Sequence, residues 1–78
     1  MQDGPIILET AGRHGMNDED ILHALRHEHH HFVGNDGMVM IVGADQSGTL
    51  IEVGLIERHG ELVVAHAMCP AHPRFLTR

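Results

Sequence analysis

The sequence contains no lysine, a single cysteine and no long run of apolar residues. Because Cys69 is the only cysteine, the chain cannot form an internal disulfide, which agrees with a reducing compartment. No apolar stretch approaches the roughly 20 residues needed to cross a bilayer, and no signal-peptide pattern is visible. We therefore expect a cytoplasmic protein that does not enter a membrane.

The absence of lysine also shapes the charge of the chain. Five arginines stand against eleven acidic residues, and with its nine histidines neutral the chain has a net charge of -6. Tight binding to nucleic-acid phosphates normally needs several clustered cations, so this balance argues against a general nucleic-acid binder. Because free histidine titrates at about pH 6.5, the net charge should depend strongly on pH.

The length of 78 residues indicates one small domain. A domain of this size buries only about 60% of the surface of its unfolded chain, which makes a large enclosed cleft improbable. The content of 42% apolar and 21% charged residues is typical of a globular protein. We expect residues 1–78 to form a single small α+β domain with a short irregular C-terminal tail from about residue 69.

One strong helix signal begins at Asn17, which can cap the helix. The acidic residues at 18–20 that follow suit the positive end of the helix dipole. Helical spacing then places apolar residues on one side, namely Ile21, Ala24, Leu25 and Phe32. The pattern predicts an amphipathic helix that runs to about His29 and packs that side inward.

Strand-like segments follow at 38–42, 49–57 and 61–68, and short loops connect them. Such short connections favour antiparallel pairing over parallel crossovers. The segment at 5–9 is a candidate edge strand, and residues 10–14 are a candidate for a short first helix. The prediction is therefore an α+β fold in which one main helix, with or without this short one, packs on a small, mainly antiparallel sheet of three to four strands.

The connection GADQSG at 43–48 has some of the glycine and serine content of a phosphate-binding loop. It lacks the terminal Lys-Ser/Thr pair of such loops and lies between two strands rather than before a helix. We interpret it as a hairpin loop.

The stretch HEHHH at 27–31 matches the H-E-x-x-H signature of zinc proteases. On a helix, histidines at i and i+4 can bind one zinc while the glutamate acts on the metal-bound water. Here the third ligand position of the extended signature is Gly37, and helical geometry places the histidines opposite the apolar side. We therefore expect a solvated histidine face and no protease, with a weak surface metal site as the alternative, formed by His23, His27 and His31.

A second constellation, His66-x-x-Cys69-x-x-His72, also contains residue types that bind zinc. It lacks paired-knuckle spacing and an obvious fourth ligand, and no oxyanion hole accompanies a Cys–His nucleophile pair. We interpret it as a strand end followed by a proline-broken tail, and we predict no cofactor.

The order of these elements resembles the BrnT toxins, which belong to the wider RelE/ParE-like group of type II toxin–antitoxin systems. The most specific part is the run RHGMNDED at 13–20, which fits the pattern R-H-G-hydrophobic-polar-D/E-E-D/E. A Gly-x-Leu/Ile-type second strand and a third strand that ends in small residues add to the resemblance, which covers about residues 11–76. It implies a ribonuclease toxin that a small DNA-binding antitoxin holds inactive.

RNA cleavage without a metal needs a base for the 2′-hydroxyl, cations that stabilise the phosphorane, and an acid for the leaving oxygen. With the resemblance, these needs make four residues the candidate catalytic set: Arg13, His14, His66 and Arg74. The partners implied are RNA and the small antitoxin, and a homodimer is a further option because a small sheet often leaves an edge that needs cover.

The chain departs from the family pattern at the end of the third strand, where Met68 replaces the expected basic residue. Together with the absence of lysine, this departure keeps two alternatives open. The first is a non-catalytic protein-interaction module with the same fold. The second is a histidine-rich metal-binding protein.

Overall fold

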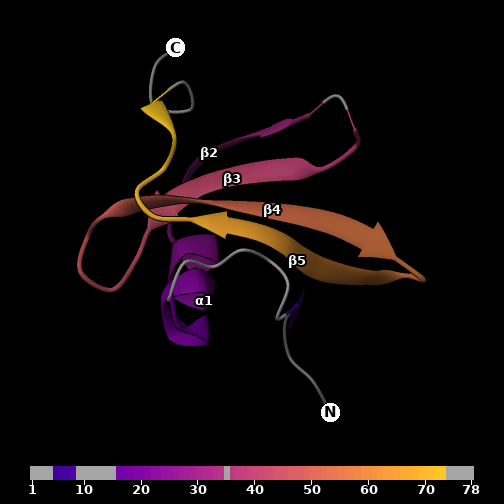
Figure 1. The fold of residues 1–78 in the computed structure, drawn as a ribbon, viewed down its shortest axis with the longest axis horizontal. Helices are drawn as coiled ribbons and strands as arrows, with labels where there is room; N and C mark the ends of the chain where they lie inside the picture. The colour runs from indigo at the N-terminus through magenta and orange to yellow at the C-terminus, as the bar shows by residue number, and fades with distance from the viewer. Residues whose placement is uncertain (1–4, 9–15, 35, 74–78) are drawn as a thin grey trace.

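The computed structural model describes residues 5–8, 16–34 and 36–73. The elements, in chain order, are β1 (Ile6–Ile7), α1 (Asp18–Arg26), β2 (Glu28–Val33), β3 (Val39–Ala44), β4 (Leu50–Arg58) and β5 (Glu61–Met68). The helix packs on one face of one sheet, which confirms the predicted α+β class (Figure 1). No helix of the described residues is long and apolar enough to cross a membrane. The short helix predicted at 10–14 lies outside the described residues.

The sheet has the strand order β1-β5-β4-β3-β2. Neighbours from β2 to β5 are antiparallel, as the short loops predict, whereas β1 pairs with β5 in parallel. The three predicted strands correspond to β3, β4 and β5, and β1 lies within the predicted edge segment. The sheet has five strands, more than the expected three to four. Three of its four described pairings are antiparallel, which agrees with the prediction of a mainly antiparallel sheet.

The additional strand is β2, where the prediction of a helix to about His29 is wrong. The helix ends at Arg26, and His27 caps it with a non-helical backbone, φ -120 and ψ 52. The next residues alternate instead with period two, since His30 and Phe32 are half-buried and their neighbours are exposed. Phe32 is paired with Met40 on β3, so it belongs to the sheet and not to the apolar side of the helix.

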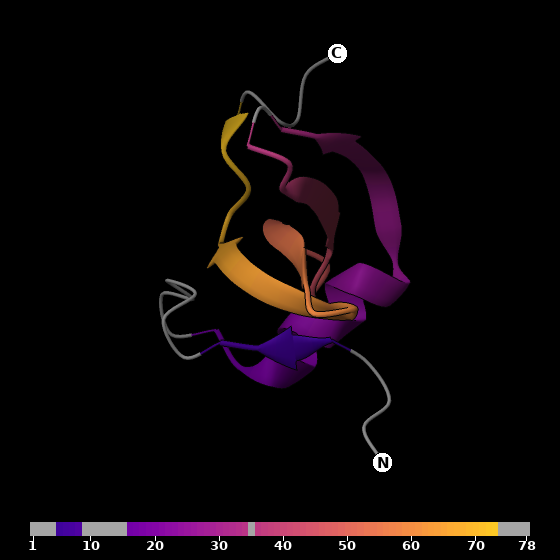
Figure 2. The ribbon, with the colours of Figure 1, turned by 90° about the vertical axis from the view of Figure 1, so that its right-hand side faces the viewer.

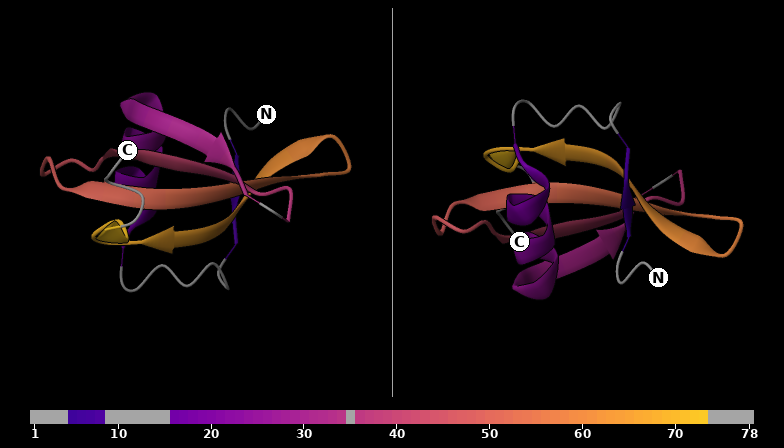
Figure 3. Two further views of the ribbon diagram at one scale, coloured as in Figure 1. Left: turned by 90° about the horizontal axis from the view of Figure 1, so that it is seen from above. Right: turned by 90° about the horizontal axis from the view of Figure 1, so that it is seen from below.

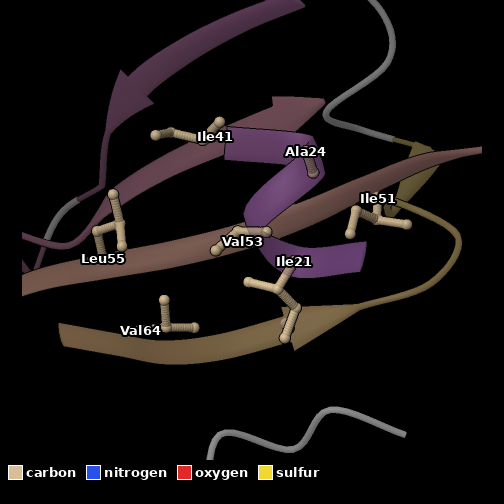
Figure 4. Close-up of a cluster of buried hydrophobic side chains, with 8 residues drawn as sticks. Ile21, Ala24, Ile41, Ile51, Val53, Leu55 and Val64 are labelled. Atoms are coloured by element: carbon tan, nitrogen blue, oxygen red, sulfur yellow. The ribbon is translucent and has the colours of Figure 1, made fainter. Parts of the chain in front are cut away.

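The helix begins where the sequence predicts, because the Asn17 side chain accepts a hydrogen bond of 2.8 Å from the backbone N–H of Asp20. Its fully buried residues are Ile21 and Ala24, whereas Leu25 is only partly buried at the edge of the core. Figure 4 shows this core, in which the helix packs on strand residues that include Ile41, Ile51, Val53, Leu55 and Val64.

Gly43 on β3 allows the helix to lie this close to the sheet. A Cβ at this position would be 2.1 Å from the carbonyl oxygen of Ala24, and main-chain atoms cannot yield as the end of a flexible side chain can. The right-hand view of Figure 3, from below, shows α1 lying across the strands. The glycine therefore fixes the distance between helix and sheet at this point.

The two faces of the sheet are covered differently. Helix α1 covers one face, and on the other side β2 and the segment after β5 rise at the two margins of the curved sheet (Figure 2). Side chains alternate along a strand, so Ile51 and Val53 face the helix while Glu52 faces away from it. The chemistry of the candidate site lies on this second face.

Candidate active site

Glu52 lies in the middle of β4, between apolar neighbours, and only 3% of it is exposed. A buried carboxylate is costly unless hydrogen-bond donors satisfy its oxygens. Both oxygens of Glu52 have such a donor, and the two donors come from different parts of the chain. Glu52 is thus the centre of a polar cluster on an otherwise apolar sheet.

The first donor is His66 on β5. Its Nε2 lies 2.7 Å from Oε2 of Glu52, and 34% of the His66 side chain is exposed. In the strand register His66 stands opposite Gly54, which places Glu52 diagonally across from it. A Cβ on Gly54 would be 3.2 Å from the His66 Cβ and 2.4 Å from the Met38 sulfur, so the glycine leaves the space that these side chains occupy.

The second donor is the backbone N–H of His72, which lies 2.6 Å from Oε1 of Glu52. One residue earlier, the N–H of Ala71 donates to the carbonyl of Leu50 at 2.9 Å, and Ala71 is 2% exposed. The segment after β5, which contains a cis Cys69–Pro70 bond, therefore lies against β4. Strand β5 ends at Met68, and these two hydrogen bonds anchor the described residues that follow it. The irregular tail expected from about residue 69 stays a prediction.

These contacts determine which nitrogen of His66 can act on a substrate. An ionised carboxylate only accepts hydrogen bonds, so Nε2 of a neutral His66 must carry the proton that it shares with Glu52. The lone pair then lies on Nδ1, for which the described residues offer no hydrogen-bond partner. A half-buried imidazole oriented by a buried carboxylate is suited to general acid–base catalysis, with Nδ1 as the reacting atom.

Of the four predicted catalytic residues, the structure describes only His66. Arg13, His14 and Arg74 lie outside the described residues, so their distances from His66 stay untested. Sequence reasoning missed Glu52, although a signal was present. A single acidic residue inside the apolar run TLIEVGLIE must either face solvent or find a buried partner.

The histidines of HEHHH do not share a helix face, because His27 caps the end of α1 while His31 is on β2. His23 donates from Nδ1 to the Ala44 carbonyl at 2.8 Å, and its ring stacks on His27 with 4.2 Å between centroids. His31 bonds instead to Glu28. The shared helix face assumed for the protease signature, and for the weak metal site through His23, His27 and His31, is therefore wrong.

Side chains that bind metal ions do not gather in the part of the chain that the structure describes. There, no group of three or more histidine, cysteine, aspartate or glutamate side chains could hold a metal ion. In the motif His66-x-x-Cys69-x-x-His72, the cysteine is exposed, His66 binds Glu52, and the main chain of His72 binds the same carboxylate. Two residues of the motif, His66 and His72, thus bind the one carboxylate of Glu52.

Charge near the candidate site is sparse. The described cations are Arg26 at the end of α1 and Arg58 at the end of β4, and both are exposed. Arg26 belongs to the element on the opposite face of the sheet, and Arg58 is six residues from Glu52 along an extended strand, about 20 Å away. Within the described residues, therefore, neither arginine can stabilise a phosphate next to His66.

Known proteins give no independent assignment of this site. Comparisons of the chain with family models, with curated proteins and with solved structures found no match. The resemblance to BrnT toxins, carried by the run at 13–20, therefore stays a proposal.

Proposed function

We propose that the chain is a BrnT/RelE-like toxin-type domain that cleaves RNA without a metal, with His66 as a proton-transfer group. The single observation that carries this proposal is the hydrogen bond between the half-exposed His66 imidazole and the buried Glu52 carboxylate. Carboxylate-oriented imidazoles serve as bases because the carboxylate fixes the tautomer and stabilises the cation formed on proton transfer. The sequence resemblance supplies the substrate class.

In the proposed reaction, Nδ1 of His66 accepts the proton of an RNA 2′-hydroxyl. The 2′-oxygen then bonds to the adjacent phosphorus, and the bond from phosphorus to the 5′-oxygen breaks. The leaving oxygen takes a proton from a second group, for which His14 is the candidate, and Arg13 and Arg74 are the candidates for neutralising the phosphorane. The products are a 2′,3′-cyclic phosphate and a free 5′-hydroxyl.

The first prediction tests this assignment directly. Purified protein should cleave single-stranded RNA in the presence of a metal chelator, and His66→Gln should slow cleavage by about a hundredfold or more, the usual contribution of a positioned acid or base. His29→Gln is the matched control, because it removes an exposed histidine of β2. We would follow product formation by gel electrophoresis and folding by circular dichroism.

Two outcomes would contradict the proposal. Well-folded parent protein that leaves RNA intact in the chelator would exclude the nuclease activity. Equal cleavage by the parent and by His66→Gln would show that the reaction does not use this imidazole.

The toxin setting adds a partner to the proposal, namely a small antitoxin that inhibits the domain. Expression of the chain alone should arrest growth, and co-expression of a small DNA-binding protein encoded beside it should restore growth. Growth arrest that persists in the His66→Gln variant would separate toxicity from the proposed chemistry.

A second candidate is a non-catalytic protein-interaction module with the same fold. The observation that favours it is the position of Arg26 and Arg58, both remote from His66. RNA cleavage needs cations near the phosphate, and neither arginine of the described residues supplies one beside His66. A folded protein that neither binds nor cleaves RNA, yet forms a stable complex with the neighbouring small protein, would favour the module.

A further inference from the structure

The segment after β5 contacts β4 at two alternate residues. The N–H of Ala71 bonds to the Leu50 main chain, and the N–H of His72 bonds to the Glu52 side chain. The first contact is an ordinary main-chain hydrogen bond that attaches the segment to the sheet. The second ends on the carboxylate that orients His66, so the segment and the imidazole share one acceptor group.

Two donors hold the Glu52 carboxylate more firmly than one could. The terminal torsion of a glutamate is broad, so a bond from His66 alone would leave the carboxylate plane free to rotate. The His72 N–H binds the other oxygen, with 2.6 Å between the nitrogen and Oε1, and hydrogen bonds to an ionised carboxylate are stronger than bonds between neutral groups. Together the two bonds fix the plane of the carboxylate and with it the direction of the His66 ring.

We propose that the backbone N–H of His72 is a positioning group for the candidate active site. It holds Glu52 in the orientation that keeps His66 in the Nε2–H tautomer, with Nδ1 directed away from the carboxylate. This inference rests on the proposed function for its catalytic meaning. The orientation of Glu52 by the His72 N–H, and the resulting tautomer of His66, do not depend on that function.

The main chain of residue 72, and not its side chain, carries the proposed role, and this permits a matched pair of variants. His72→Ala removes the imidazole and keeps the N–H, whereas His72→Pro removes the N–H donor. A merely structural contribution of the side chain would affect both variants. Loss of the positioning bond would affect only the proline variant.

The experiment measures ring nitrogen NMR shifts of His66, which distinguish the two tautomers, together with RNA cleavage. We expect His72→Ala to keep the Nε2–H tautomer of His66. We expect His72→Pro to show mixed tautomers and to cleave RNA about tenfold to a hundredfold more slowly, as for small misplacements of catalytic groups. Identical His66 spectra in the two variants would overturn the proposal.

Amide hydrogen exchange in the parent protein provides a second measurement if His72→Pro does not fold. The His72 amide should exchange far more slowly than the amide of Gly60, which lies in the exposed β4–β5 turn and donates none of the backbone hydrogen bonds seen among the described turns and loops. Equally rapid exchange of the two amides would overturn the proposal. If the parent fails to cleave RNA while the His66 tautomer still depends on the His72 N–H, the proposed function falls and the positioning role stands.

Discussion

Two carboxylates are buried in the described part of the chain, and they differ in how far away their partners lie in the sequence. Asp45 takes all its donors from the next few residues, since one oxygen accepts from the N–H and hydroxyl of Ser47 and from the N–H of Thr49. Glu52 takes its donors from His66 and His72, at sequence separations of 14 and 20. One carboxylate closes a turn, and the other joins three separate segments.

This difference has an electrostatic counterpart. The hydrogen bond from the Ser47 side chain, supported by main-chain N–H groups of the same turn, lowers the pKa of Asp45 despite its burial. All those donors belong to the hairpin loop between β3 and β4, so the ionised Asp45 stabilises local structure. At Glu52 one donor is the imidazole of His66, a group able to transfer protons, which suits this carboxylate to a chemical role that Asp45 lacks.

The largest expected difference between the two carboxylates concerns activity. Glu52→Gln should reduce RNA cleavage by about tenfold to a hundredfold. The glutamine carbonyl would accept from the His72 N–H, so its amide group would face Nε2 of His66 and favour the Nδ1–H tautomer. Nδ1 would then lack the lone pair that the proposed reaction needs. Single-turnover cleavage rates would test this prediction.

Glu57→Gln, an exposed carboxylate on the same strand, is the control and should cleave RNA at the parental rate. Full activity of Glu52→Gln, with a His66 spectrum like that of the parent, would show that Glu52 does not orient His66 for the reaction. Glu52 would then differ from Asp45 only in the sequence distance of its partners.

The reverse pattern is expected at Asp45, where the effect should fall on stability. Asp45→Asn should lower the unfolding free energy by about 1 to 3 kcal/mol at neutral pH, since neutral hydrogen bonds replace charge-assisted ones. Because folding lowers the pKa of Asp45 from 3.8, the stabilisation by its ionised form is complete well above that value. It is lost as the pH falls below 3.8 through the folded-state pKa. Urea denaturation at several pH values would measure the difference in unfolding free energy between the parent and Asp45→Asn.

In this pH series, parent and Asp45→Asn should approach equal stability at the acidic end. RNA cleavage at neutral pH should stay at the parental rate wherever the variant is folded. A stability gap that does not change with pH would mean that the charge of Asp45 is not what stabilises the turn.

The smallest expected effect concerns the space beside the Glu52–His66 pair. Gly54→Ala places a methyl group against the Met38 sulfur and close to the Cβ of His66. Because the end of a methionine side chain can move aside, the cost in unfolding free energy should be only about 1 kcal/mol. Cleavage should fall about severalfold, since His66 must shift slightly. Thermal unfolding and cleavage rates, measured together, would show whether the site tolerates the methyl group.

The sequence allowed much of the fold to be predicted, and its local signals were the dependable ones. Asn17 marked the helix start, and the loop at 43–48 was recognised as a hairpin. The end of the helix was misplaced because Phe32 fits a helical repeat as well as the period-two pattern of β2. The parallel pairing of β1 with β5 had no local signal at all.

The candidate site was only partly predictable for the same physical reason. His66 was identified from the motif near the chain end and from the resemblance, whereas its partnership with Glu52 depends on strand register. Register is a long-range property that no residue pattern within β4 or β5 specifies alone. The His72 N–H was beyond sequence reasoning, because a main-chain donor leaves no trace in residue identity.

The parallel pairing of β1 with β5, in which Ile6 lies beside Val63, has a consequence for protein synthesis. A ribosome makes β1 before the other described elements, and β1 must wait for its neighbour until β5 has emerged. Contacts so distant in sequence form late and slow the folding of small proteins. Glu52 likewise has both of its donors only after residue 72 has been added, since the first is on His66 and the second is the N–H of His72. The cluster of Glu52, His66 and His72 can therefore form only after residue 72 has been made, so chemistry that depends on this cluster cannot begin before that point.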